Sequence, residues 1–366
     1  MINLKRKIML LVPSLRGGGA ERVMATLAAN LDIEKFEIRL VLVNKEGPYL
    51  KMIPSGIPII DLKCSRVRYA APKLITEINN FKPEVILSTL GHLNLLLLGV
   101  RKSIKANTKI IVRHAIAPSA SMRKYPLIKR RLWIRLYRYL YSKSDIVLAQ
   151  CSEMKKDLST VFSLDEEKIR YIYNPLDIEG IRKAMISNNP YNKNKINILA
   201  VGRLTYQKGF DILLDAFSIV NSRIPGCHLT ILGDGMLKEE LEEQACRLNI
   251  QDKISLVGFK DNPYPYYYYS DLYVLSSRYE GFPNTLLEAL ACGTKVVSTA
   301  CKTGPTEVIG DNKYGVLVRM ENANELANAI IKYLGSESKT GSRADCFELK
   351  DIINDYEDLF FQLAQD

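Results

Sequence analysis

Short apolar runs alternate with helical patterns along the whole chain, and this alternation restricts the fold more than any other feature of the sequence. Strands that alternate with helices indicate a doubly wound parallel sheet. The first series of expected strands is Lys7–Val12, Glu37–Val43, Ile57–Asp61, Val85–Ser88, Lys109–Arg113, Asp145–Ala149 and Lys168–Ile172. The second series is Ile196–Val201, His228–Leu232, Lys253–Leu256, Asp271–Leu275, Lys295–Ser298 and Gly315–Val318.

A polar, proline-containing stretch, Asn188–Lys195, separates the two series and predicts a linker. We therefore expect an α/β protein with two facing Rossmann-like domains, over residues 1–188 and 189–345, and a last amphipathic helix within 346–366. Because ligands of such sheets bind beyond the carboxyl ends of the strands, the predicted site is the cleft between the domains.

The segment Arg278–Thr294 follows the apolar run Asp271–Ser276, a predicted buried strand, and contains a loop and the start of a helix. Gly281 and Pro283 interrupt the chain, and Asn284 begins a composition that favours a helix. The first N–H groups of a helix have no partners within it, and its dipole places positive charge there. This segment therefore predicts an anion-binding site.

Two carboxylates, Glu280 in the loop and Glu288 about one turn into the helix, flank this anion site. Carboxylates accept hydrogen bonds from hydroxyl groups and repel phosphate, so the pair suits the two sugar ends of a nucleotide-diphosphate-sugar. The spacing alone leaves another interpretation open, in which Glu280 is a solvated loop residue and Glu288 an exposed helix residue.

Two cations follow the first strand of the second series. Arg203 and Lys208 lie across one strand-to-helix turn, where both can point at a single diphosphate, although an ordinary basic loop has the same pattern. Gly233 begins a further turn after the strand that ends at Leu232.

The glycine run Gly17–Gly19 follows the first strand and allows backbone N–H groups to approach a ligand, or simply makes a tight turn. Its spacing is not that of a dinucleotide fingerprint. His114 follows the strand Lys109–Arg113, and His92 lies earlier in the same half of the chain. Either histidine can equally be a packed or solvated residue.

The segment EGFPNTLLEALACGTKVVST, residues 280–299, resembles the donor-binding E-x7-E signature of the family-4 retaining glycosyltransferases, which have the GT-B fold. Residues 18–22 resemble the GGAER loop of these enzymes, and Arg203 and Lys208 match their diphosphate-binding cations. The resemblance covers nearly the whole chain and is strongest from Gly202 to Gly315.

The resemblance implies transfer of a hexose or N-acetylhexosamine from a nucleotide-diphosphate-sugar, expected to be uridine-linked, to a saccharide acceptor with retention of configuration. The residues that it implies for catalysis are His114, Glu280, Arg203 and Lys208. Those that it implies for donor binding are Gly18, Gly19, Arg203, Lys208, Gly233, Glu280, Gly281, Phe282, Pro283, Asn284, Thr285, Leu286 and Glu288. Those that it implies for the acceptor side are Gly17, His92 and His114.

No D-x-D motif occurs in the chain, so the usual carboxylate pair for a divalent ion is missing. We expect no metal and no cofactor, because the nucleotide-sugar is a substrate. Residues 303–307, TGPTE, resemble a G-P-x-E turn of family members that act on lipid-linked sugars. With the basic first domain, this turn suggests an acceptor linked to a polyprenyl diphosphate, as in the assembly of O-antigen or capsule polysaccharides.

Positive charge is concentrated in the first half of the chain: residues 1–180 carry 31 Lys/Arg and 16 Asp/Glu. Residues 123–143 contain eight of these cations and no acid, and Ile128, Leu132, Leu136 and Leu140 form an i, i+4 stripe along them. A basic amphipathic helix of this kind predicts contact with an anionic membrane surface. Alternatively, the stripe packs on the sheet and the charges face water.

The sequence has no apolar run of about 18 residues that would predict a membrane span. Its seven scattered cysteines form no C-x-x-C pair, which favours reduced thiols in a cytosolic compartment. We expect a cytoplasmic enzyme, peripheral on the inner face of the cell membrane. Two other classes remain open: a nucleotide-sugar 2-epimerase of the same fold, and a nonspecific nucleic-acid binder, since no specific nucleic-acid motif is present.

Overall fold

The computed structural model describes residues 5–310, 312–336 and 343–365. The chain forms two compact units, which we describe separately: Met1–Pro175 with Leu349–Asp366, and Leu176–Glu348. In the part of the chain that the structure describes, no helix is long and apolar enough to cross a membrane.

The first unit contains a seven-stranded parallel sheet with the strand order β3-β2-β1-β4-β5-β6-β7. Its strands are β1 Arg6–Val12, β2 Phe36–Leu42, β3 Ile59–Asp61, β4 Val85–Thr89, β5 Lys109–Arg113, β6 Ile146–Ala149 and β7 Ile169–Tyr171. Its helices are α1 Gly19–Asn30, α2 Ala71–Phe81, α3 Gly91–Gly99, α4 Pro118–Arg123, α5 Leu127–Tyr141, α6 Ser152–Phe162 and α14 Leu349–Gln365. The strand order reverses between β1 and β4, and ligands of such sheets bind beyond the carboxyl ends of the strands at a reversal of this kind.

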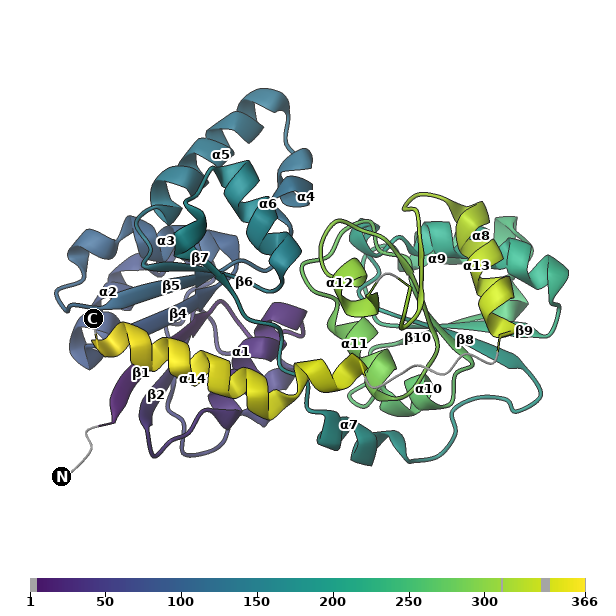
Figure 1. Cartoon of the computed structure of the whole chain (residues 1–366), viewed down its shortest axis with the longest axis horizontal. Coiled ribbons are helices and arrows are strands. Elements are labelled where there is room, and N and C mark those ends of the chain that lie inside the picture. The colour runs from purple at the N-terminus through teal and green to yellow at the C-terminus, as the bar shows by residue number, and fades with distance from the viewer. Residues whose placement is uncertain (1–4, 311, 337–342, 366) are drawn as a thin grey trace. The chain divides into compact units, whose positions relative to one another are not determined.

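The last helix, α14, belongs to the core of the first unit although it is distant in sequence (Figure 1). Its apolar face packs with β1, β2 and α1, and Phe360 meets Phe36 edge to face at 6.2 Å. Its buried Glu357 accepts a hydrogen bond from the backbone N–H of Asp32 and pairs with Lys35 at 2.9 Å. Burial of one amphipathic face therefore fixes α14 on this unit.

The second unit contains a six-stranded parallel sheet with the strand order β10-β9-β8-β11-β12-β13. Its strands are β8 Ile196–Val201, β9 Cys227–Leu232, β10 Ile254–Gly258, β11 Leu272–Leu275, β12 Val296–Thr299 and β13 Val316–Val318. Its helices are α7 Ile178–Met185, α8 Phe210–Arg223, α9 Lys238–Arg247, α10 Tyr264–Tyr268, α11 Asn284–Ala291, α12 Pro305–Ile309 and α13 Ala323–Leu334. Here the order reverses between β8 and β11.

The predicted α/β class, with two doubly wound parallel sheets, is confirmed, and every strand lies within two residues of its expected bounds. The division between the units falls after Pro175, earlier than the expected boundary at 188, because α7 packs on α10 and α11 of the second unit. The expected linker Asn188–Lys195 also belongs to this unit: the Tyr191 hydroxyl donates to the carbonyl of Tyr266 at 2.9 Å.

Candidate active site

Three loops of the second unit meet at the carboxyl ends of β8, β9 and β11, where the strand order reverses. Gly233, after β9, has a φ of +130°, and a Cβ at this position would lie 2.0 Å from the carbonyl oxygen of Gly202 after β8. The Ser276 hydroxyl, after β11, donates to the carbonyl of Lys208 at 2.8 Å. These contacts bring together segments that are far apart in sequence.

A buried ion pair lies at the centre of this loop cluster. Lys208 Nζ is 2.7 Å from Glu280 Oε1, and the two side chains are 15% and 7% exposed. The Ser277 hydroxyl donates to the same Glu280 oxygen at 2.6 Å, and the Thr303 hydroxyl donates to the Glu280 carbonyl at 2.6 Å. The carboxylate is thus held through one oxygen, and Glu280 is not the solvated loop residue of the alternative interpretation.

Arg203, the second predicted cation, has a different environment. It is exposed after β8, and its guanidinium has no ion-pair partner among the residues that the structure describes. An exposed guanidinium with five N–H donors can bind a diphosphate without first breaking an internal pair. Lys208 and Arg203 therefore offer one paired and one unpaired cation at the same turn.

The loop before α11 brings Gly281, Phe282 and Pro283 against Gly304, whose φ is +94°. A Cβ at Gly304 would lie 2.5 Å from Pro283 Cδ, so only glycine fits this close approach. Pro283 occupies the N-cap position of α11 and provides no side-chain cap. The anion-binding role that the sequence predicts for the start of α11 stays a prediction.

Glu288 is buried within α11, so the alternative of an exposed helix residue is wrong. The buried Tyr267 hydroxyl donates to Glu288 Oε2 at 3.2 Å, and the Tyr273 hydroxyl donates to Thr285 Oγ1 at 2.8 Å. Burial, together with the nearby charges of Glu280 and Glu288, raises the pKa of Tyr273. The charges of both glutamates thus affect one buried tyrosine.

In the first unit, a carboxylate of the chain itself occupies the predicted anion position. Glu21, in the first turn of α1, accepts hydrogen bonds from the backbone N–H groups of Gly17 at 3.0 Å and Gly18 at 2.7 Å. The Ser14 hydroxyl also donates to Glu21, at 3.1 Å. A phosphate could use the N–H groups of Gly17 and Gly18 only after displacing Glu21, an obstacle that the glycine pattern does not reveal.

His114 is buried after β5, with its ring 5.7–5.8 Å from the rings of Tyr137, Tyr141 and Phe162. Burial lowers the pKa of His114 to about 4, so the imidazole is neutral. His92 is exposed near the start of α3. The catalytic role of His114 and the acceptor role of His92 stay predictions.

Sequence reasoning missed the residues that hold the site together. Ser277 and Thr303 fix Glu280, and Tyr267 contacts Glu288. Arg278 makes two hydrogen bonds to Asp211, at 2.8 and 2.6 Å, and fastens the site loop to α8. The polar pair Ser276-Ser277 directly after an apolar strand was the one available signal, because the other contacts join distant segments.

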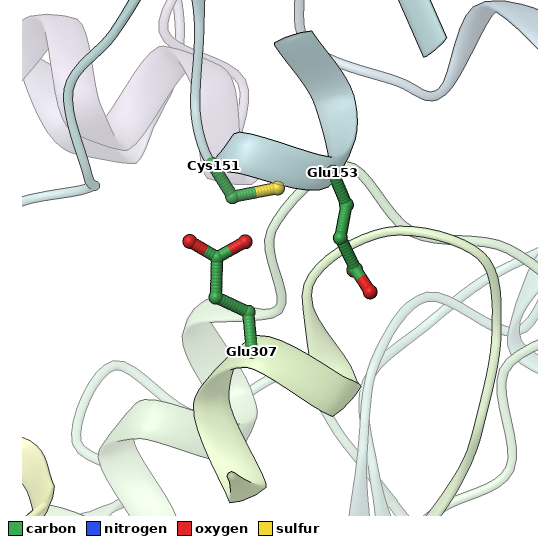
Figure 2. A group of neighbouring side chains, drawn as sticks. All are labelled: Cys151, Glu153 and Glu307. Atoms are coloured by element: carbon green, nitrogen blue, oxygen red, sulfur yellow. The ribbon is translucent and has the colours of Figure 1, made fainter. Parts of the chain in front are cut away.

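Figure 2 shows Cys151 and Glu153 at the start of α6, and Glu307 on α12. A thiolate and two carboxylates are possible metal ligands. Cys151 and Glu153 belong to the first unit and Glu307 to the second, so neither unit by itself contains this ligand set. The thiol of Cys151 also accepts a hydrogen bond from the backbone N–H of Met154 at 3.4 Å, which caps α6.

The basic helix α5 exposes most of its apolar stripe. Ile128 is 79% exposed, and Leu132 and Leu136 are exposed as well, whereas Leu140 is buried. The helix packs instead through Tyr137, Leu140 and Tyr141. The rings of the two tyrosines contact Phe162 of α6. The alternative in which the whole stripe packs on the sheet is therefore wrong for its first three members.

Comparisons with known proteins agree for both units. Residues 17–179 match the model of Glycosyltransferase Family 4, and residues 182–347 match that of Glycosyl transferases group 1. The chain is 31% identical over 369 residues to the N-acetylgalactosamine-N,N'-diacetylbacillosaminyl-diphospho-undecaprenol 4-alpha-N-acetylgalactosaminyltransferase of Campylobacter jejuni, covering 96% of the chain and 98% of that protein. It is also 28% identical over 330 residues to the amylovoran biosynthesis glycosyltransferase AmsD of Erwinia amylovora, covering 90% of each.

Solved structures show the same architecture. A glycosyltransferase from Rickettsia africae superposes with a TM-score of 0.80 at 20% identity over 99% of each chain. Sucrose-phosphate synthase from Thermosynechococcus elongatus superposes with a TM-score of 0.82 at 18% identity, over 98% of this chain and 99% of that one. These matches agree with the two Rossmann-like parallel sheets and with the E-x7-E segment that runs from the loop after β11 into α11. The chain therefore belongs to the family-4 glycosyltransferases with the GT-B fold.

Proposed function

We propose that this glycosyltransferase moves a hexose or N-acetylhexosamine from a nucleotide-diphosphate-sugar to a saccharide carried on a lipid diphosphate, with retention of configuration. The single observation that carries the proposal is the loop cluster after β8 and β11, where Arg203, Lys208 and the start of α11 gather beside two buried glutamates. Positive groups suit the diphosphate, and Glu280 and Glu288 suit the hydroxyls of the hexose and the ribose.

The Lys208–Glu280 pair suggests how the donor would be accommodated. The Lys208 ammonium has three donors and uses one on Glu280 Oε1, so it can contact a phosphate while keeping the internal pair. Ser277 and Lys208 share Oε1, which leaves Glu280 Oε2 for a sugar hydroxyl. One buried pair can thus contact both the charged part and the neutral part of the donor.

In the proposed reaction, the bond between the anomeric carbon and the diphosphate oxygen breaks, and the acceptor oxygen bonds to that carbon on the same face. The acceptor proton passes to the departing phosphate oxygen, so no protein nucleophile is needed. Negative charge grows on the diphosphate as its bond to the sugar breaks, and Arg203 and Lys208 would stabilise that charge most in the transition state. The proposal assigns this role to fixed cations and includes no metal.

For the acceptor, the proposal rests on the Campylobacter jejuni relative, whose name specifies a diphospho-undecaprenol substrate and an alpha linkage. AmsD is named for the biosynthesis of a polysaccharide, amylovoran. We infer that this chain also acts in the assembly of a surface polysaccharide, at the cytoplasmic face of a membrane.

Helix α5 provides a surface that suits this location. It lies on the outside of the first unit, next to α3 and α6 (Figure 1). Leu127, Ile128 and Leu132 are more than half exposed beside the cations Lys129, Arg130, Arg131 and Arg135. Each cation near an anionic bilayer contributes about 1 kcal/mol, and exposed aliphatic side chains add burial in the interface.

A panel of nucleotide-sugars tests the donor assignment. A donor that binds the folded protein raises its melting temperature by mass action, so thermal shifts identify the sugar and base. Turnover of that donor is then followed with and without a lipid-diphosphate saccharide, in EDTA and in magnesium. Acceptor-dependent transfer that survives EDTA supports the proposal. Conversion of the donor to its 2-epimer without acceptor, or activity that needs magnesium, contradicts it.

Flotation with liposomes tests the membrane surface. We expect the wild-type protein to float with vesicles that contain anionic lipid at low salt. A variant with Lys129, Arg130, Arg131 and Arg135 changed to Gln should stay at the bottom of the gradient, because its electrostatic attraction is lost. A matched variant neutralised at Lys238, Lys253, Lys260 and Lys313 of the second unit should still float. Equal flotation of wild type and the α5 variant would contradict the assignment.

A further inference from the structure

A buried hydrogen-bond network surrounds His114. The Tyr141 hydroxyl is 2.9 Å from His114 Nδ1, and Asn94 Nδ2 is 3.0 Å from the same hydroxyl oxygen. Asn94 Nδ2 is also 3.0 Å from the backbone carbonyl oxygen of Arg113. The network joins α3, α5 and the end of β5 at the carboxyl side of the sheet, and all of its side chains are buried.

The donor and acceptor capacities of these groups indicate where each hydrogen of the network lies. The carbonyl of Arg113 can only accept, so the Asn94 atom beside it must be the amide nitrogen. That nitrogen also donates to the Tyr141 oxygen. If His114 Nδ1 donated to the same oxygen, the single hydrogen of this buried hydroxyl would have no acceptor among the described residues, so we infer that the hydroxyl donates to Nδ1. Nδ1 is then an acceptor without a hydrogen, and a neutral imidazole must carry its hydrogen on Nε2.

The surroundings support this protonation state. Burial lowers the pKa of His114 to about 4 and raises the pKa of Tyr141 well above its usual value, so the ring stays neutral and the hydroxyl keeps its hydrogen. Asp157 of α6 raises the pKa of His114, but less than burial lowers it. The titratable side chains packed around the ring are thus Tyr137 and Tyr141 of α5 and Asp157 of α6.

We propose that Asn94 and Tyr141 are positioning residues that hold His114 as the neutral imidazole with its hydrogen on Nε2. His114 is then a hydrogen-bond donor and not a general base. The consequence for catalysis rests on the proposed function: on the acceptor side, where the resemblance places His114, Nε2–H donates to an oxygen of the bound ligand. This agrees with a reaction in which the departing phosphate oxygen, and not a protein side chain, takes the acceptor proton.

Nitrogen-15 NMR of the full-length protein, labelled at histidine, tests the proposal without any ligand. The chain has three histidines, and the His114→Gln variant identifies the resonances of His114. Between pH 6 and 8 we expect Nδ1 to resonate as an unprotonated, hydrogen-bonded nitrogen and Nε2 as a protonated one. A protonated Nδ1, or a rapidly exchanging mixture of the two tautomers, would overturn the proposal.

Two matched variants separate the hydrogen bond from ring packing. Tyr141→Phe removes the hydroxyl, so the Nδ1 resonance should move toward that of a nitrogen without a hydrogen bond, and turnover should fall about tenfold. Tyr137→Phe changes a ring at the same 5.8 Å distance and should leave the Nδ1 resonance in place. An unchanged resonance in Tyr141→Phe would overturn the inference. If the tautomer is as expected but no nucleotide-sugar binds, the proposed function fails and the inference stands.

Discussion

The loops at the two strand-order reversals of this protein carry different charged groups. Between β8 and β11, Lys208 and Glu280 form a buried ion pair, and Arg203 is exposed without an ion-pair partner among the described residues. In the first unit, the glycine loop after β1 is closed by Glu21, and the buried histidine after β5 is neutral. Two sheets of the same class therefore carry different groups: one has an exposed cation beside a buried ion pair, and the other has a glycine loop closed by a carboxylate and a neutral histidine.

This difference suggests that the two units bind different parts of the substrates, although they share the same fold. Cations suit the diphosphate of a donor, and neutral hydrogen-bonding groups suit a hydroxyl-rich saccharide. In both units the predicted binding residues follow the carboxyl ends of the strands, and the loops there determine which chemical groups can be bound.

The largest expected effect is that of Lys208→Met. It removes a cation that the proposed mechanism places at the departing diphosphate, so we expect kcat to fall about a thousandfold. It also leaves Glu280 buried without its partner, so we expect the free energy of unfolding to fall by about 3 kcal/mol. The double variant Lys208→Met/Glu280→Gln should regain stability but not activity. Steady-state kinetics measures the loss of activity, and chemical denaturation measures the loss of stability. Recovery of activity in the double variant would show that the second unit does not need the Lys208 cation.

The neutral histidine of the first unit predicts a pH effect on stability. The unfolded chain protonates His114 near pH 6.5, whereas the folded protein resists protonation down to about pH 4. Between these values the unfolded state binds more protons, so stability falls as pH falls, by about 3 kcal/mol in total. Denaturation at several pH values should show this slope in wild type and lose it in His114→Gln. The half-buried His228 offers a control, since His228→Gln should keep most of the slope.

Arg203→Ala tests the unpaired cation of the second unit. The side chain is exposed and has no internal ion pair among the described residues, so we expect an unchanged melting temperature. Activity should fall about a hundredfold, because the proposed mechanism gives this side chain a contact to the transition state. Arg247→Ala on α9, also exposed, is the matched control and should retain full activity. Wild-type turnover in Arg203→Ala would remove this residue from the site.

The smallest expected effect concerns the closed loop of the first unit. Glu21→Ala frees the N–H groups of Gly17 and Gly18 and should lower the free energy of unfolding by about 1 kcal/mol. Inorganic phosphate should then raise the melting temperature of the variant more than that of wild type, because the emptied position accepts an anion. Equal phosphate effects on Glu21→Ala, Glu21→Gln and wild type would show that the loop has no latent anion site.

Much of this protein was determined by its sequence. The alternation of apolar runs and helical patterns specified both parallel sheets, because a strand buried on two faces has to be short and continuously apolar. The run Asp271–Ser276 specified a strand, the following segment Arg278–Thr294 specified a loop and a helix, and the spacing of Arg203 and Lys208 placed both cations on one turn. These features are local, so a linear pattern is enough to predict them.

Only the tertiary structure decided which groups pair. Glu280 contacts Lys208, which lies 72 positions earlier in the chain, and Tyr141 and Asn94 set the hydrogen positions on His114 from two different helices. The exposed stripe of α5 was likewise undecided, because periodicity shows that a helix has an apolar face but not what covers it. Pairing, burial and protonation depend on neighbours in space, and those neighbours exist only once the chain has folded.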